Sequence, residues 1–159
     1  MITRSQRSMA VYLMIELNLK RAYEIDTLFM AINVMDRYLS MLGHWNIEPK
    51  QMEVLACSCL LIAAKLEQPQ VPNYQNMIYA YDDLKGQEQS TMTKADIKEM
   101  EEKVLVQLGF DFNFTSPRHF LDRYIRLFEG HCSEETKTLA LQILVLQQVN
   151  EKMLVYSGS

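Results

Sequence analysis

Histidine and cysteine come first, because these side chains most often bind metals or act as nucleophiles and bases. The chain has three of each: His44, His119, His131, Cys57, Cys59 and Cys132. Their spacing matches no zinc-ligand pattern, and the chain has neither a glycine-rich phosphate loop nor a nucleophile elbow. We therefore expect no catalytic residue, no metal and no cofactor, and we do not expect an enzyme.

An uncharged, apolar stretch of the sequence is followed directly by charged residues. Residues 54–64 carry no charge, and their apolar side chains fall on every side of a helical period. Such a helix must be surrounded, and it is too short to cross a bilayer. It ends in Lys65 and Glu67, with Pro69 behind them. We predict that the helix over about residues 49–66 is the most buried element and that it presents a charged end to a partner.

The elements around this helix are predicted from apolar periodicity and capping residues. We expect them over residues 5–19, 26–43, 73–80, 93–109, 117–130 and 133–153, with a surface loop over residues 81–90. Asp26, Thr93 with Asp96, Ser116 and Ser133 are expected to cap helices, and residues 98–103 to form a solvated helix face. In the sixth helix the side chains expected to point inward are Phe120, Leu121, Tyr124, Ile125 and Phe128. The predicted class is all-α.

Composition narrows the setting. The 159 residues are 48% hydrophobic, with five glycines and four prolines, which suits one or one and a half compact helical domains. A net charge of −4 gives no general attraction to nucleic acid or to an anionic membrane. The odd set of cysteines indicates core residues in a reducing compartment, and the first residues do not resemble a signal peptide. We expect a location in the nucleus or the cytoplasm.

Four segments resemble the cyclin family, in the right order and at near-family spacing. They are residues 26–40 (DTLFMAINVMDRYLS), 60–67 (LLIAAKLE), 100–112 (from Met100-Glu101 to LGFDF) and 116–121 (SPRHFL). The resemblance implies a cyclin-like five-helix repeat, the first cyclin box, over residues 1–114. Residues 115–159 would then be the first helices of an incomplete second repeat, so the chain is expected to be cut from a longer protein.

The resemblance also assigns single residues. Arg7 and Asp36 match a structural pair of the family, and Val54 stands where a leucine is usual. Lys65 and Glu101 match the lysine and glutamate that grip the kinase in cyclins. The positions that match the family's apolar kinase contacts are Ile62, Leu66, Leu105, Phe110 and Phe112, for which ordinary core packing is the alternative. Gln68 replaces a commonly acidic residue, so one contact is expected to be weaker.

The function implied by the resemblance is binding and activation of a cyclin-dependent Ser/Thr protein kinase. The similarity is closer to the mitotic-type cyclins, and no residue identifies the kinase. The alternative is a cyclin-fold scaffold that binds a partner other than a kinase. Because neither Lys65 nor Glu101 belongs to an apolar stripe, we expect that replacing either one weakens kinase binding and leaves folding nearly unchanged.

A second family surface is expected to be altered. In the family, a Met-Arg-Ala-Ile-Leu run and a later Trp line a groove for Arg-x-Leu motifs. The matching residues here are Gln6, Arg7, Ser8, Met9, Ala10 and Leu13. A polar residue and two shorter side chains remove apolar contact, so we predict weak or no binding of such peptides.

Overall fold

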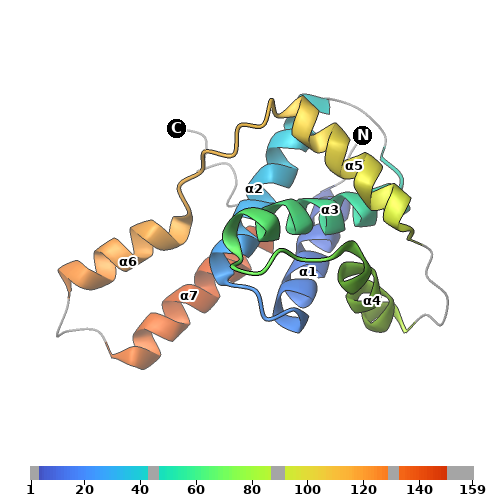
Figure 1. Ribbon diagram of the computed structural model, residues 1–159. Coiled ribbons are helices and arrows are strands. Elements are labelled where there is room, and N and C mark those ends of the chain that lie inside the picture. Colours follow the sequence, from blue (N-terminus) through green and yellow to red (C-terminus); the bar gives the residue numbers. More distant parts are fainter. Residues whose placement is uncertain (1–3, 43–46, 87–91, 129–132, 150–159) are drawn as a thin grey trace. The chain divides into compact units, whose positions relative to one another are not determined.

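A computed structural model describes residues 4–42, 47–86, 92–128 and 133–149. These residues form seven α-helices and no strand, which confirms the predicted all-α class. The helices are α1 (Arg4–Lys20), α2 (Ile25–Leu42), α3 (Pro49–Glu67), α4 (Tyr74–Lys85), α5 (Lys94–Gln107), α6 (Pro117–Leu127) and α7 (Glu134–Val149) (Figure 1). The chain divides into two compact units, Met1–Asn113 and Phe114–Ser159. The predicted repeat boundary between residues 114 and 115 stays a prediction.

Helix α3 is the centre of the first unit. It contacts α1, α2, α4 and α5, and all of residues 54–64 are buried (Figure 1). Pro49 occupies its first turn, where its missing N–H costs no hydrogen bond. The one hydroxyl in the buried stretch, that of Ser58, donates to the Val54 carbonyl at 2.8 Å or to the Ile97 carbonyl at 3.2 Å. The prediction that this helix is surrounded is confirmed.

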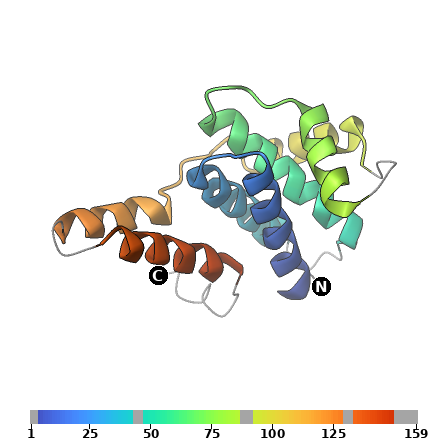
Figure 2. The same ribbon diagram turned by 90° about the horizontal axis from the view of Figure 1, so that it is seen from below.

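The other helices of this unit form a shell around α3. Figure 2 shows α1 beside α2 on one side and α4 on the other, in agreement with the contacts of α1 with both helices. Cys57 and Cys59 lie fully inside the shell, and burial raises the pKa of both thiols. A thiol held in its protonated form reacts slowly, so both cysteines are core residues.

Two predicted boundaries are wrong. Asp26 does not cap α2, because the helix already begins at Ile25 and the carboxylate lies in its first turn. Residues 81–85 are not a loop, because α4 continues to Lys85 and ends at Gly86, whose φ of +62° is left-handed. Tyr81 explains the longer helix. Its side chain is only 2% exposed, so the core requires this turn despite its polar neighbours.

Helix α5 begins and ends with clear signals. Thr93 Oγ1 accepts from Asp96 N at 3.2 Å, and Asp96 Oδ2 accepts from Thr93 N at 2.8 Å, which confirms the predicted capping box. The Thr93 N–H and the Thr93 hydroxyl both donate to Asp96 Oδ2, and these two bonds hold the pKa of Asp96 below its usual range. After the helix, Gly109 and Phe110 both have positive φ, +59° and +58°. For Phe110 this conformation is unfavourable, and it gives a sharp turn.

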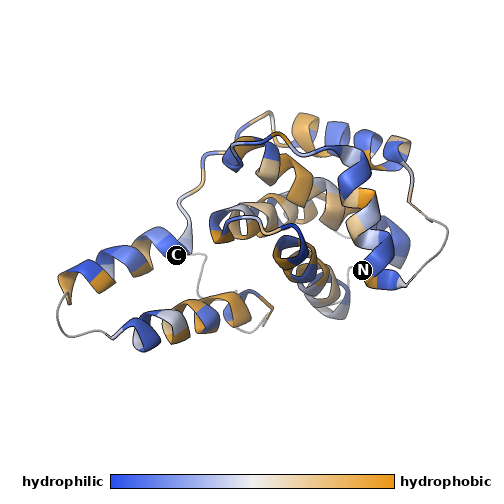
Figure 3. Cartoon of the chain, turned by 60° about the horizontal axis from the view of Figure 1, so that its bottom comes forward, coloured by the Kyte–Doolittle hydropathy of each residue, from blue (hydrophilic) through white to orange (hydrophobic). Residues whose placement is uncertain are grey.

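Among the described residues, the second unit contains the helices α6 and α7, which contact each other. Ser116 and Ser133 cap them, accepting from Arg118 N and Thr136 N at 3.2 Å each. The prediction that α6 turns its apolar side chains inward is wrong, because no side chain of either helix is buried. Exposure reaches 55% for Phe120, 61% for Tyr124 and 57% for Phe128. Two helices that pack on each other enclose no core. Figure 3 shows hydrophobic residues on both helices.

Several predicted features lie outside the described residues. They are the helix-ending residues Gly43 and Gly130, the apolar residue Met153, and His44, His131 and Cys132. Within the described ranges, no group of His, Cys, Asp and Glu side chains is placed to hold a metal ion. None of the helices there combines the length and the apolar character that crossing a bilayer requires.

Candidate protein-binding site

Lys65 and Glu101, thirty-six residues apart in the chain, form an ion pair. Lys65 lies in the last turn of α3, and Glu101 lies in the middle of α5. Lys65 Nζ is 2.5 Å from Glu101 Oε1 and 3.0 Å from the hydroxyl of Tyr74, the first residue of α4. That hydroxyl donates to Glu101 Oε2 at 2.5 Å. We call Lys65, Tyr74 and Glu101 the Glu101 cluster. Three helices meet in it.

Burial differs among the members of the Glu101 cluster. The Glu101 side chain is 8% exposed and that of Lys65 is 28% exposed. Burial by itself lowers the pKa of Lys65, but the bonds to Glu101 and Tyr74 and the charge of Glu101 outweigh it and raise the pKa above its usual value. The ammonium is therefore held charged, and its side chain is more exposed than that of Glu101.

The burial of Glu101 changes one expectation from the sequence. Residues 98–103 form a mostly solvated face, as predicted, but Glu101 is buried within it. Replacing Glu101 removes the partner of Lys65 and of the Tyr74 hydroxyl inside the folded chain. We therefore expect the replacement to lower the stability of the fold as well. Periodicity did not reveal this, because a carboxylate at a buried position has the same sequence pattern as a solvated one.

The predicted apolar contact residues are not equivalent. Leu66 and Phe110 are 54% and 66% exposed, whereas Leu105 and Phe112 are half-buried. Ile62 is 3% exposed and belongs to the core, which is the packing alternative stated for this set. Of the five predicted apolar contact residues, Leu66 and Phe110 are therefore the most exposed.

Polar bonds position the segments that carry this surface. Arg37 of α2 donates to the Asp111 carbonyl at 2.9 Å and to its carboxylate at 3.3 Å, which ties the turn after α5 to α2. Gln68 Nε2 donates to Thr27 Oγ1 at 2.7 Å, so the residue at the commonly acidic position is engaged inside the chain. Tyr74 and Arg37 were missed from the sequence, because nothing in their local pattern indicates such distant partners.

The structural pair joins α1 to α2. Arg7 Nε and Nη2 donate to the two carboxylate oxygens of Asp36, each at 2.7 Å. Such a bidentate bond fixes both side chains in one plane. Val54 is buried in α3, where it packs in the core. Arg7 and Val54 are buried and both carboxylate oxygens of Asp36 accept from Arg7, so we assign these three residues to the stability of the fold.

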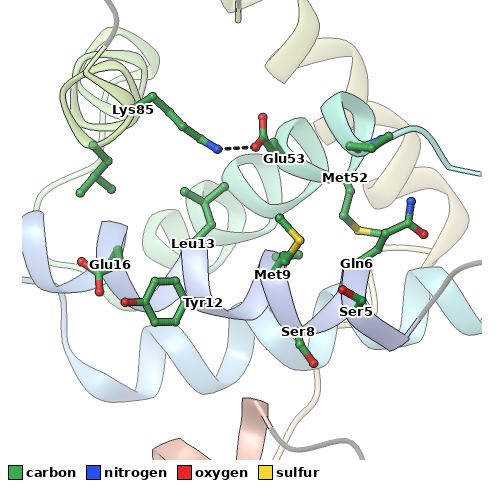
Figure 4. A pocket seen from close by; sticks show the side chains of 13 residues that line it. Ser5, Gln6, Ser8, Met9, Tyr12, Leu13, Glu16, Met52, Glu53 and Lys85 are labelled. Carbon is green, nitrogen blue, oxygen red and sulfur yellow. Dashed lines mark hydrogen bonds and ion pairs between the residues drawn. The ribbon is translucent and has the colours of Figure 1, made fainter.

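A cavity of about 600 Å³ lies between α1, α3 and α4 (Figure 4). It is lined by Ser5, Gln6, Ser8, Met9, Ala10, Tyr12, Leu13, Glu16, Pro49, Met52, Glu53, Leu84 and Lys85. We call it the α1 groove. It contains the predicted altered patch except Arg7, which faces Asp36. Met9 is 66% exposed, but Ala10 is 2% exposed and offers almost no contact. Gln6 Nε2 donates to the Ile47 carbonyl at 3.0 Å.

One rim of the α1 groove carries a second cluster of the same residue types. Lys85 Nζ is 2.5 Å from Glu53 Oε1, and the Tyr81 hydroxyl donates to Glu53 Oε2 at 2.6 Å (Figure 4 draws the ion pair). We call Glu53, Tyr81 and Lys85 the Glu53 cluster. Burial raises the pKa of Glu53, but the bonds from Lys85 and Tyr81 and the charge of Lys85 outweigh it and lower the pKa.

The sequence is similar to those of several cyclins. The chain is 29% identical over 158 residues to G2/mitotic-specific cyclin-B2 of Bos taurus, covering 99% of this chain and 37% of that protein. It is 29% identical over 161 residues to Cyclin-A1-2 of Arabidopsis thaliana, covering 99% and 34%. It is 30% identical over 138 residues to Cyclin-A2-1 of Oryza sativa subsp. japonica, covering 87% and 26%.

The chain thus spans between 26% and 37% of the length of these relatives. A family model described as the N-terminal domain of cyclins matches residues 1–113. Because that match covers more than two thirds of the 159 residues, the chain belongs to the cyclin family.

Proposed function

We propose that the chain binds and activates a cyclin-dependent Ser/Thr protein kinase through the surface around Lys65. Membership of the cyclin family indicates a regulatory role without catalysis. Activation of a kinase is a more specific role than family membership indicates. It is a proposal because the chain covers only part of the length of its relatives. Placement in the nucleus or the cytoplasm belongs to the same proposal.

The Glu101 cluster is the main structural support for the proposed kinase binding. An ammonium group has three donor hydrogens, and within the described residues Lys65 directs two bonds, to Glu101 and Tyr74. A donor therefore remains for an acceptor on a partner. Leu66, which follows Lys65 in the last turn of α3, and Phe110, in the turn after α5, are exposed and supply apolar area. If the Lys65 ammonium becomes desolvated in a complex, its bond to the partner carries a large share of the binding free energy, and the apolar side chains add burial.

The mechanism follows from the chemistry of kinases. An active kinase needs a Lys–Glu ion pair that depends on the position of its C-helix. A protein that binds only the inward position of this helix shifts the kinase towards the active state, without taking part in phosphoryl transfer. Lys65 donating to backbone carbonyls of the kinase, with Leu66 and Phe110 packed beside it, would supply such a preference.

The test compares Lys65→Ala with Lys85→Ala. Both variants remove one lysine from a Lys–Glu–Tyr cluster, so the change in charge is the same. We expect Lys65→Ala to weaken binding to a responsive kinase more than tenfold, because truncating one side of a desolvated bond leaves the other unpaired. Lys85→Ala should leave binding within about twofold of the parent.

Binding is measured by titration against a panel of recombinant cyclin-dependent kinases, and activation by phosphorylation of a peptide substrate. Circular dichroism shows that each variant is folded at the assay temperature. Equal binding by the parent and Lys65→Ala would contradict the proposed site. A parent chain that binds none of the kinases would favour the scaffold alternative, with a partner other than a kinase.

A further inference from the structure

We propose that Tyr74 is a positioning residue, which holds the Lys65 ammonium in the place where a kinase meets it. The inference rests on the proposed function and deepens it. Its basis is the position of the Tyr74 hydroxyl, which bonds both members of the ion pair instead of lying beside one of them.

The three bonds of the Glu101 cluster form a closed ring. Lys65 Nζ bonds Glu101 Oε1 at 2.5 Å, Glu101 Oε2 accepts from the Tyr74 hydroxyl at 2.5 Å, and that hydroxyl accepts from Lys65 Nζ at 3.0 Å. Both carboxylate oxygens are therefore used. A lysine held by one carboxylate alone can still swing on its flexible stem. A second bond from another direction fixes the ammonium.

The ring of Tyr74 adds a third restraint. Lys65 Nζ lies 4.5 Å from its centroid, within the range of a cation–π interaction. Lys94 Nζ lies 5.5 Å from the same centroid, so the ring attracts two cations. The side chain of Tyr74 thus contacts Lys65 through its hydroxyl and through its face.

Tyr74 can position Lys65 only if it is itself held in place. It is the first residue of α4, and the preceding Asn73 caps this helix by accepting from Gln75 N at 3.0 Å. Met77 and Ile78 follow within the next turn and are buried against the unit. The position of the hydroxyl therefore depends on the docking of α4, and it stays defined when either charge is removed.

The expected effect of losing the hydroxyl is specific. In Tyr74→Phe the ring and the Lys65–Glu101 bond remain, but the ammonium gains freedom that a kinase must remove on binding. Ordering one such side chain corresponds to a loss of about three- to tenfold in affinity. A tyrosine with a purely structural role would change the stability of the chain and leave its affinity unchanged.

The experiment measures the Kd of a responsive kinase for four chains: the parent, Tyr74→Phe, Lys65→Ala and the double variant. Tyr81→Phe, which removes the matching hydroxyl from the Glu53 cluster, is the control. We expect about three- to tenfold weaker binding for Tyr74→Phe, no further loss when it is added to Lys65→Ala, and no change for Tyr81→Phe.

Two results would overturn the inference while the proposed function stands. One is an unchanged affinity of Tyr74→Phe when Lys65→Ala binds weakly. The other is the same loss from Tyr74→Phe with and without Lys65, which would mean that the tyrosine acts independently of the ammonium. If Lys65→Ala itself binds as the parent does, the kinase site and the inference both fail.

Discussion

Two clusters in the first unit have the same composition, one Lys, one Glu and one Tyr, but they are buried in opposite ways. In the Glu101 cluster the carboxylate is the buried member, at 8% exposure, and the tyrosine is half-buried. In the Glu53 cluster the tyrosine is the buried member, while the carboxylate and the lysine are 28% and 36% exposed. The bond lengths are nearly equal, so burial decides what each cluster contributes to stability.

The clusters also differ in how the chain assembles them. Tyr81 and Lys85 are four residues apart on α4 and share one side of it, so docking of α4 on α3 is sufficient to form the Glu53 cluster. The Glu101 cluster takes one residue from each of α3, α4 and α5. It therefore forms only when all three helices are in place, which makes it a sensitive reporter of the folded unit.

The largest contrast is expected from removing the two carboxylates. Glu101→Ala should lower the free energy of unfolding by about 2–3 kcal/mol, because it leaves a charge and a hydroxyl without their buried partner. Glu53→Ala should cost less than about 1 kcal/mol, because water screens that pair and can replace it. Urea unfolding followed by circular dichroism measures both. Equal losses would show that burial does not distinguish the clusters.

The α1 groove beside the Glu53 cluster allows a test of peptide binding. A peptide with an Arg-x-Leu motif should bind more weakly than micromolar, because Ala10 and the half-buried Leu13 and Gln6 supply too little apolar area, a deficit of about 1–3 kcal/mol. Fluorescence polarisation with a labelled peptide measures this. Leu13→Trp should increase the affinity by enlarging the apolar lining. A micromolar or lower Kd for the parent would show that the groove has kept this specificity.

The hydroxyl of the buried Tyr81 should contribute less to the free energy of unfolding than the carboxylate of Glu101 does. Tyr81→Phe keeps the ring that fills the core and removes only one of the two bonds to Glu53, so we expect a loss of about 0.5 kcal/mol of unfolding free energy. Tyr79→Phe is the matched control on the same helix, since Tyr79 is 63% exposed, and it should have almost no effect. Thermal or urea unfolding compares the two. A larger loss from Tyr79→Phe would contradict the assignment of the buried hydroxyl.

The smallest expected contrast between the clusters is in how their contributions to stability depend on pH. The contribution of Glu53 is lost in acid, and that of Lys65 is lost in alkali. The pKa of Glu53 is lower in the folded chain, so its contribution is present above the usual pKa of 4.5 and is lost as the pH falls through the folded value. The pKa of Lys65 is higher in the folded chain, so its contribution is present below the usual 10.5 and is lost as the pH rises through the folded value.

Glu53→Gln should therefore be less stable than the parent by a few tenths of a kcal/mol at about pH 7, and the gap should close at about pH 3. Lys65→Met should show the larger gap at about pH 7, and that gap should close only in strong alkali. Unfolding free energies across the pH range measure both. If the stability difference between the parent and Glu53→Gln widened in acid, it would contradict a lowered pKa of Glu53 in the folded chain.

Local patterns in the sequence determined much of the fold. The uncharged residues 54–64 required a surrounded helix, because no face of that stretch prefers water. Thr93 with Asp96, and Ser116 before Pro117, marked helix starts, because the bonds they make lie within three residues. The signals failed where tertiary packing overrode the local preference. Asp82, Asp83 and Lys85 look like a loop, but Tyr81 fills the core and keeps that segment helical.

The site divides in the same way. The sequence by itself identified Lys65 at the charged end of the buried helix, and the family resemblance paired it with Glu101. Only the tertiary structure decided that Glu101 is buried, that Ile62 belongs to the core while Phe110 is exposed, and that Tyr74 joins the ion pair. The physical reason is distance along the chain. These properties depend on where α3, α4 and α5 meet, and no window of neighbouring residues contains that information.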